Sequence, residues 1–218
     1  DGVASFEFPY LVELVSKTQF DTIYHEHFSY LSFGSVKRIF ETVGLEVFDV
    51  EQLPTHGGSL RVYAQRRESG RFHVLESVHR LHAFEAALEV GSSSFYDGFQ
   101  ERADRIKDDL LKFLLDAAKS GQTVVGYGAA AKGNTLLNYA GVGRDLLSYV
   151  VDNNPVKQGK YLPGSRIPIV DEQRIVEDCP DFVLVLPWNL REEILRRLDL
   201  LDGWSGSVVT AVPELQVG

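Results

Sequence analysis

The sequence predicts an α/β protein in which residues 121–218 form a Rossmann-like domain with a parallel sheet. Three observations support this prediction. Short apolar segments alternate with amphipathic helical segments after residue 120. The strand segments are apolar throughout, which is typical of strands covered by helices on both faces of a sheet. A glycine-rich turn, Gly126–Gly133, joins the first of these strands to a helix, where Rossmann-like domains carry such a turn.

The first 72 residues contain elements for only half a domain. Two edge strands and two helices bury too little surface to be stable alone, so we expect residues 1–72 to be the end of a larger α/β domain. The glycines and serines at the helix ends are typical capping residues. The expected elements are a strand at 3–9, a helix at 10–17, a helix that Ser35 caps and Gly44 ends, and strands at 45–50 and 59–65.

Two helices follow, and we assign residues 73–120 to a linking segment. Apolar residues recur at three- and four-residue spacing in both helices, over 73–90 and over 95–120. The Rossmann-like domain then occupies residues 121–218. Its expected strands are 123–128, 146–152, 182–186 and 207–212, and its expected helices are 132–139, 171–177 and 190–198.

Composition limits the classes of function. The chain has 218 residues, of which 44% are hydrophobic, and no apolar run approaches the ~18–20 residues that span a bilayer. Its 22 Lys and Arg against 31 Asp and Glu give a net charge of −9. Nucleic acids and anionic membranes are bound through cationic surface, so we expect neither as a partner.

The counts of sulfur-containing residues are unusual. Cys179 is the single cysteine, which excludes a disulfide within the chain or a Cys-rich zinc site and fits a reducing cytoplasm. The sequence contains no Met and begins at Asp1. We therefore expect it to be a fragment of a longer protein.

The densest chemistry lies in Tyr24-His25-Glu26-His27-Phe28-Ser29-Tyr30. An extended backbone would place His25 and His27 on one face, whereas a bend would let Tyr24, Glu26 and His27 converge. An imidazole beside a carboxylate and a phenol moves protons near neutral pH. Two other interpretations stay open: a metal site formed by His25 and His27 with Glu26 or His56, and a polar loop without chemistry.

Two glycine-containing segments are candidate binding sites. In Thr55–Arg61, paired glycines between two strands leave N–H groups open to a ligand, and neighbouring polar side chains could meet a phosphate or a sugar hydroxyl. A simple β-turn explains the glycines equally well. In Gly126–Gly133 the third glycine is displaced from the G-x-G-x-x-G pattern, and Asp152 ends the next strand. This arrangement indicates either nucleotide binding or close packing of strand and helix.

Three other residues are given structural roles. His79 and His82 lie one helical turn apart, and we interpret them as lining a solvated or interhelical face. Cys179 precedes Pro180 at a strand entrance without a partner motif, so we interpret it as structural.

Several strings together resemble the S-adenosylmethionine-dependent C-methyltransferases that act on nucleotide-linked 4-keto-deoxysugars. The family-like strings are Phe20-Asp21-Thr22-Ile23-Tyr24-His25-Glu26-His27-Phe28-Ser29-Tyr30, Thr55-His56-Gly57-Gly58-Ser59-Leu60-Arg61, Gly126-Tyr127-Gly128-Ala129-Ala130-Ala131-Lys132-Gly133-Asn134-Thr135 and Asp152-Asn153-Asn154-Pro155. The resemblance implies a layout of a zinc-binding module, a class I methyltransferase domain and a C-terminal Rossmann-like domain. Residues 1–72 would then be the end of the methyltransferase domain. The zinc cysteines and most of the S-adenosylmethionine site are expected before Asp1, which would leave the fragment inactive by itself.

The resemblance also implies roles for individual residues. His27 would be the base that removes the C3 proton next to the 4-keto group, and Tyr24 and Glu26 would stabilise the enolate, shuttle protons or orient His27. The nucleotide-sugar would meet the following residues: His56, Gly57, Gly58, Ser59, Arg61, Lys132 and Asn134. The main rival is an NAD- or nucleotide-binding Rossmann module without a methyltransferase role.

Overall fold

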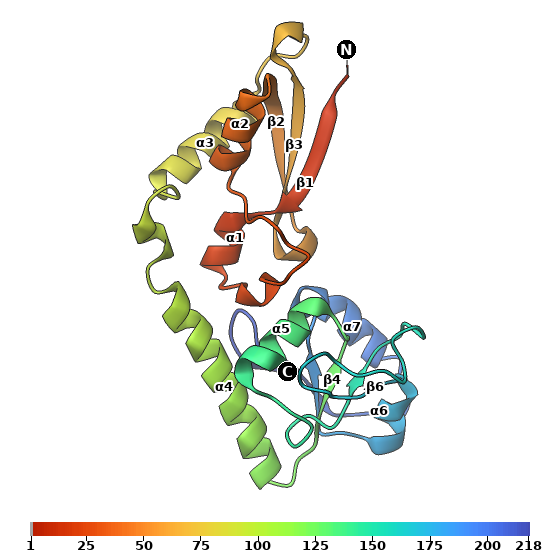
Figure 1. Cartoon of the computed structure of the whole chain (residues 1–218). Coiled ribbons are helices and arrows are strands. Elements are labelled where there is room, and N and C mark those ends of the chain that lie inside the picture. Colours follow the sequence, from red (N-terminus) through yellow and green to blue (C-terminus); the bar gives the residue numbers. More distant parts are fainter. Residues whose placement is uncertain (1) are drawn as a thin grey trace. The chain divides into compact units, whose positions relative to one another are not determined.

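The computed structural model describes residues 2–218, and the chain divides into two compact units (Figure 1). Unit 1 comprises Asp1–Thr18, of which residues 2–18 are described, and His27–Phe99. Unit 2 comprises Gln19–Glu26 and Gln100–Gly218. The chain therefore contributes a short N-terminal segment to a unit that is otherwise built from its second half.

Unit 1 is a three-stranded antiparallel sheet with helices on one face. Strand β3 lies between β1 and β2, and a bulge interrupts the β2–β3 pairing between Val47 and Asp49. The elements are β1 Ala4–Pro9, α1 Leu11–Ser16, α2 Phe33–Thr42, β2 Leu45–Leu53, η2 Thr55–Gly57, β3 Ser59–Arg66, η3 Arg67–Ser69, α3 Glu76–Ala87 and η4 Ser93–Tyr96.

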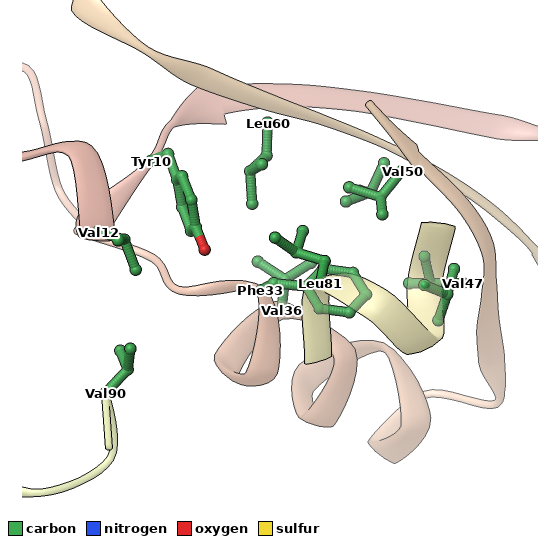
Figure 2. Close-up of a cluster of buried hydrophobic side chains, with 11 residues drawn as sticks. Tyr10, Val12, Phe33, Val36, Val47, Val50, Leu60, Leu81 and Val90 are labelled. Atoms are coloured by element: carbon green, nitrogen blue, oxygen red, sulfur yellow. The ribbon is translucent and has the colours of Figure 1, made fainter. Parts of the chain in front are cut away.

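The core of unit 1 forms where the sheet meets α2 and α3. Leu60, Val62 and Ala64 alternate along β3 and are fully buried, as expected for one covered face of a strand. Figure 2 shows Tyr10 and Leu60 on the sheet side of this cluster and Phe33 and Leu81 on the helix side. Helix α3 therefore belongs to the packed core of unit 1 and is not a linker.

The start of helix α2 differs from the prediction. Ser32, not Ser35, is the N-cap, and its hydroxyl accepts a hydrogen bond from the Ser35 N–H. The buried Glu85 carboxylate of α3 accepts bonds from the Phe33 and Gly34 N–H groups at 2.6 and 2.8 Å. The helix begins one turn earlier than predicted because Glu85, distant in sequence, satisfies donors that would otherwise be unpaired.

Unit 2 confirms the predicted α/β fold. Its six strands follow the order β6-β5-β4-β7-β8-β9, and all neighbours are parallel except the edge strand β9. The elements are η1 Phe20–Thr22, α4 Phe99–Lys119, β4 Val124–Tyr127, α5 Ala131–Ala140, β5 Val150–Val151, β6 Ile169–Val170, α6 Gln173–Asp178, β7 Phe182–Val185, η5 Trp188–Leu190, α7 Arg191–Leu198, β8 Ser207–Thr210 and β9 Gln216–Val217. Strands β6 and β9, of two residues each, were not predicted, and the predicted strand 146–152 is limited to the two residues of β5.

Helices cover both faces of this sheet. Ile175 of α6 and Ile194 of α7 pack with Val183 and its neighbours on one face. On the other face, Gly133 of α5 lies against Leu186. Right-handed crossovers place the helices on both faces, because the chain first adds strands on one side of β4 and then adds β7 on the other side of β4. The point of reversal, between β4 and β7, is where open α/β sheets form a crevice at their carboxyl ends.

The second predicted linker is also part of a core. In α4, Ile106, Leu110 and Leu114 are buried, and the Phe113 ring meets Phe182 of β7 edge-on at 5.1 Å. The predicted linking segment 73–120 is thus divided between the two units, because each helix has an apolar face that its own unit covers. Within residues 2–218, no helix is long and apolar enough to cross a bilayer.

Candidate active site

The segment that carries Tyr24, Glu26 and His27 is bent. Helix η1 ends with the Ile23 N–H bonded to the Phe20 carbonyl at 3.0 Å, and the backbone then turns at His25 and Glu26. Tyr24 and His27 are partly buried, whereas His25 and Glu26 are exposed. The extended arrangement, with alternate residues on opposite faces, is therefore wrong for this segment.

The metal interpretation of the histidines receives no support. Across residues 2–218, no group of three or more His, Cys, Asp or Glu side chains is placed to hold a metal ion. His25 and His27 lie in the turn, and His56 lies in the loop between β2 and β3. Acid–base chemistry and a plain polar loop remain as interpretations of Tyr24–Tyr30.

The loop Thr55–Arg61 has a backbone that requires its glycines. Gly57 and Gly58 have φ values of +93° and +129°, and His56 is also left-handed at +56°. A Cβ atom at position 58 would lie 2.5 Å from the Glu13 Cγ atom. Ser59 is buried, and its hydroxyl donates to the Thr55 carbonyl at 3.0 Å. The glycine pair thus has a full structural explanation in the turn itself.

Arg61 already has an anionic partner in this loop. Its guanidinium donates to the Glu7 carboxylate at 2.7 and 3.2 Å, and the Thr55 hydroxyl donates to the same carboxylate at 2.8 Å. These bonds, with Thr55 first and Arg61 second, hold the pKa of Glu7 below its usual value. A phosphate that binds Arg61 would therefore have to share the guanidinium with Glu7.

The glycine turn after β4 is shaped by packing. A Cβ atom at Gly126 would lie 2.7 Å from Val150, and one at Gly133 would lie 2.5 Å from the Leu186 Cβ atom. Gly128 has a φ of +86° and lies against Pro187. Close contact of strand and helix therefore accounts for these glycines without a nucleotide.

Asp152 does not present a carboxylate for a ribose. Its Oδ2 atom accepts from the Ala129 N–H at 2.8 Å and from the Lys157 ammonium at 3.0 Å. Its Oδ1 atom accepts from the Asn154 N–H at 2.9 Å. Both oxygens are thus used to close the loops after β4 and β5, and the side chain is buried.

An unpredicted cluster lies where β4 and β7 end. Asp21 of η1 is completely buried, and its Oδ2 atom accepts a hydrogen bond from the Trp188 indole N–H at 2.7 Å. The Lys132 ammonium lies 4.5 Å from the centre of the Trp188 ring and donates to Asn189 Oδ1 at 2.7 Å. We call Asp21, Lys132, Trp188 and Asn189 the Asp21 lock.

Burial dominates the electrostatics of this cluster. Loss of solvation raises the pKa of Asp21 to about 6, against the opposing effects of the Trp188 hydrogen bond and the Lys132 charge. Burial also lowers the pKa of Lys132, and the charge of Asp21 opposes that shift. Asp21 Oδ1 is buried without a hydrogen-bond partner among the described residues.

Sequence reasoning missed the Asp21 lock for a clear reason. Asp21 stands in the family-like string, but no local spacing links it to Lys132 or to Trp188, 167 residues away. The one local indication was that Asp21 stands next to Phe20, an apolar residue that a buried helix would carry. Only the fold brings these side chains together.

The remaining predicted residues are placed as follows. Asn134 is partly buried in the first turn of α5, and its Oδ1 atom has no hydrogen-bond partner in the described chain. His79 and His82 are exposed on α3, which confirms the solvated face. Cys179 is an exposed left-handed residue at the C-terminus of α6, and its thiol donates to the Val176 carbonyl at 3.2 Å.

Comparison with known proteins identifies the kind of chain. Residues 54–213 match the family described as "C-methyltransferase C-terminal domain". Over 218 residues the chain is 38% identical to a protein named C-methyltransferase NovU from Streptomyces niveus, and it covers 51% of that protein's length. The chain thus spans about half the length of this curated relative.

Proposed function

We propose, from the premise that this chain belongs to the C-methyltransferase family, that it is the C-terminal part of an S-adenosylmethionine-dependent enzyme that methylates carbon in a nucleotide-linked 4-keto-deoxysugar. The observation that carries this proposal is the turn at residues 24–27. In a chain of this family, Tyr24, Glu26 and His27 give this turn a phenol, a carboxylate and an imidazole. The chain by itself is expected to be inactive.

His27 is the proposed base. A keto group at C4 acidifies the C3 proton, and a neutral imidazole is suited to remove it near pH 7. Tyr24, as a donor, would stabilise the negative charge that develops on the C4 oxygen. Glu26 would orient the imidazole and stabilise its protonated form.

The described residues do not fit S-adenosylmethionine. In the glycine segment Gly126–Gly133, the space and the N–H groups that a cofactor would need are taken up by close packing, by Asp152 and by the neighbouring Asp21 lock. When bound elsewhere in the enzyme, the cofactor supplies an activated methyl group. The work assigned to this chain is therefore proton removal and orientation of the sugar, and no zinc site is placed in it.

Two segments, one in each unit, are each proposed by themselves as contacts for the nucleotide-sugar. Where η2 leads into β3, His56 of η2 and Arg61 of β3 would meet phosphate or sugar oxygens, while Gly57, Gly58 and Ser59 shape the backbone between them. At the start of α5 the proposed contacts are Lys132, which has donated one of its three N–H groups to Asn189, and Asn134, whose Oδ1 atom is buried without a hydrogen-bond partner in the described chain. A phosphate bound at the start of α5 would also be stabilised by the positive electrostatic field at the N-terminus of that helix.

Proton exchange at C3 of the sugar tests the base directly. The complete enzyme is incubated with the nucleotide-linked keto sugar in D₂O without methyl donor, and deuterium at C3 is followed by NMR. His27→Ala should abolish both exchange and methylation, whereas His25→Ala, a change of the neighbouring imidazole, should leave exchange within a few-fold of wild type. Exchange at the wild-type rate in His27→Ala would refute the assignment.

The rival function, a dinucleotide-binding module, has less support. Asp152 is occupied by the chain's own donors, and the crevice between β4 and β7 contains Asp21. Titration calorimetry of the 218-residue chain separates the two functions. We expect no NAD binding at millimolar concentration, and tight NAD binding would favour the rival. We also propose a cytoplasmic enzyme, in keeping with the single free Cys179.

A further inference from the structure

Residues 24–26 of the Tyr24–His27 segment belong to unit 2. Gln19–Glu26 groups with residues 100–218, although about 75 residues separate the two in the sequence. Helix η1 packs against α5, and the Phe20 ring lies 5.1 Å from the ring of Tyr139. Tyr24 and Glu26 thus follow directly after a short helix that is docked on α5 of the Rossmann-like unit.

The docking place is the crevice that Rossmann-like folds use for ligands. Lys132 follows β4, and Trp188 and Asn189 follow β7, the two strands between which the strand order reverses. In other proteins of this architecture a ligand lies outside the carboxyl ends of these strands. Here the side chain between them is Asp21, which belongs to the chain itself.

The geometry points to Asp21 as a positioning residue: held by the Trp188 indole N–H, it fixes the start of the Tyr24–Glu26 turn in the place where that turn can act on the sugar. This inference rests on the proposed function. It gives the Rossmann-like domain a task that needs no nucleotide of its own. The domain orients Tyr24 and Glu26, the residues just before the proposed base His27.

The energetics favour this role over a purely structural one. A carboxylate buried with one oxygen unpartnered costs folding free energy, and an apolar residue would fill the same space at lower cost. Phe20 and Tyr139 already provide the apolar part of the docking. The carboxylate adds a directional contact: the hydrogen bond from the indole N–H to Oδ2 fixes the orientation of η1 more narrowly than apolar packing does.

Trp188→Phe tests the lock with minimal change of shape, since it keeps the aromatic ring and removes the N–H donor. The chain provides a matched control: Trp204 in the same unit donates its indole N–H to the Pro180 carbonyl, also at 2.7 Å. Trp204→Phe therefore loses an equivalent bond away from Asp21. Asp21→Asn is the second variant, which keeps an acceptor and removes the charge that faces Lys132.

The first measurement is hydrogen–deuterium exchange on the 218-residue chain. The Ile23 and Tyr24 amides are hydrogen-bonded within the segment. We expect Trp188→Phe to accelerate their exchange by about tenfold or more, because a bond to a charged, buried group is lost. Trp204→Phe should leave these amides within about twofold of wild type. Unchanged exchange in Trp188→Phe and in Asp21→Asn would overturn the lock.

The second measurement is made on the complete enzyme. Trp188→Phe should lower the rates of C3 proton exchange and of methylation at saturating substrate by about tenfold to a hundredfold, with KM for the nucleotide-sugar within about threefold. Faster amide exchange together with wild-type catalysis would overturn the positioning role. A wild-type enzyme that neither exchanges nor methylates would overturn the proposed function instead, and amide exchange would still test the lock.

Discussion

The buried carboxylate of Asp21 makes a quantitative prediction for the pH dependence of stability. Its pKa rises from 3.8 to about 6 on folding, mainly because burial removes water from the charged form. A rise of this size corresponds to about 3 kcal/mol of free energy. The folded chain binds the Asp21 proton more tightly than the unfolded chain, so this contribution is complete below pH 3.8 and is lost as the pH rises through 6.

The perturbation is Asp21→Asn, which has no carboxyl group to titrate. The free energy of unfolding of wild type minus that of the variant should fall by about 2–2.5 kcal/mol between pH 4 and pH 7 and then become constant. Lys132, whose charge acts on Asp21, is the same in both proteins. Titration of Asp21 alone should therefore set the slope.

Urea denaturation monitored by tryptophan fluorescence is the assay, because the two tryptophans of the chain, Trp188 and Trp204, both lie in unit 2 with Asp21. Asp181→Asn is a control of opposite sign. Hydrogen bonds from Thr123 hold the pKa of Asp181 below 3.8, so its contribution is present above that pH and is lost on acidification. A wild-type-minus-Asp21→Asn difference that stays constant from pH 4 to pH 7 would refute the electrostatic account of the lock.

Three further substitutions test the packing. Gly58→Ala should destabilise unit 1 by about 1–3 kcal/mol in chemical denaturation, because it combines a φ of +129° with a Cβ atom 2.5 Å from the Glu13 side chain. Gly133→Ala should destabilise unit 2 by a similar amount, about 1–3 kcal/mol, because its methyl group would overlap Leu186. The midpoint of its urea denaturation should fall, and calorimetric titration with NAD should still show no binding. Glu85→Gln should lower the stability of unit 1 by about 1–2 kcal/mol at pH 7, because the amide replaces one of two acceptors for the N–H groups that begin α2.

Gly44→Ala is the matched control for the glycine variants. Its φ is +74°, but nothing lies within 4 Å of an added Cβ atom. We expect it to cost about 1 kcal/mol from backbone strain alone. A loss in Gly58→Ala no larger than that in Gly44→Ala would contradict the close contact with Glu13.

Much of the secondary structure follows from the sequence. The predicted strands at 59–65 and 182–186 correspond to β3 and β7, and the predicted helices at 132–139 and 190–198 correspond to α5 and α7. Periodicity works here because each element is long enough to repeat its pattern and has one buried face. The family-like strings, confirmed by the match to the C-methyltransferase family, were also present in the sequence alone.

The boundaries of the units did not follow from the sequence. Helices α3 and α4 have the amphipathic pattern of any covered helix, and that pattern does not state which sheet supplies the cover. The same holds for the N-cap of α2: the sequence allows Ser32 or Ser35, and the Glu85 carboxylate, which binds the Phe33 N–H, favours Ser32. Both errors have one cause: the deciding contact comes from a residue far along the chain.

The site shows the same division between local and tertiary information. The sequence by itself determined which side chains are chemically able to move a proton, because Tyr24, Glu26 and His27 are adjacent and their types define the chemistry. Tertiary structure alone decided that the glycine turn packs against the residues after β7, that Asp152 binds its own loop, and that Asp21 binds Trp188 beyond the end of β7. The physical reason is that burial and hydrogen bonding depend on neighbours in space, and the partner of Asp21 is 167 residues away.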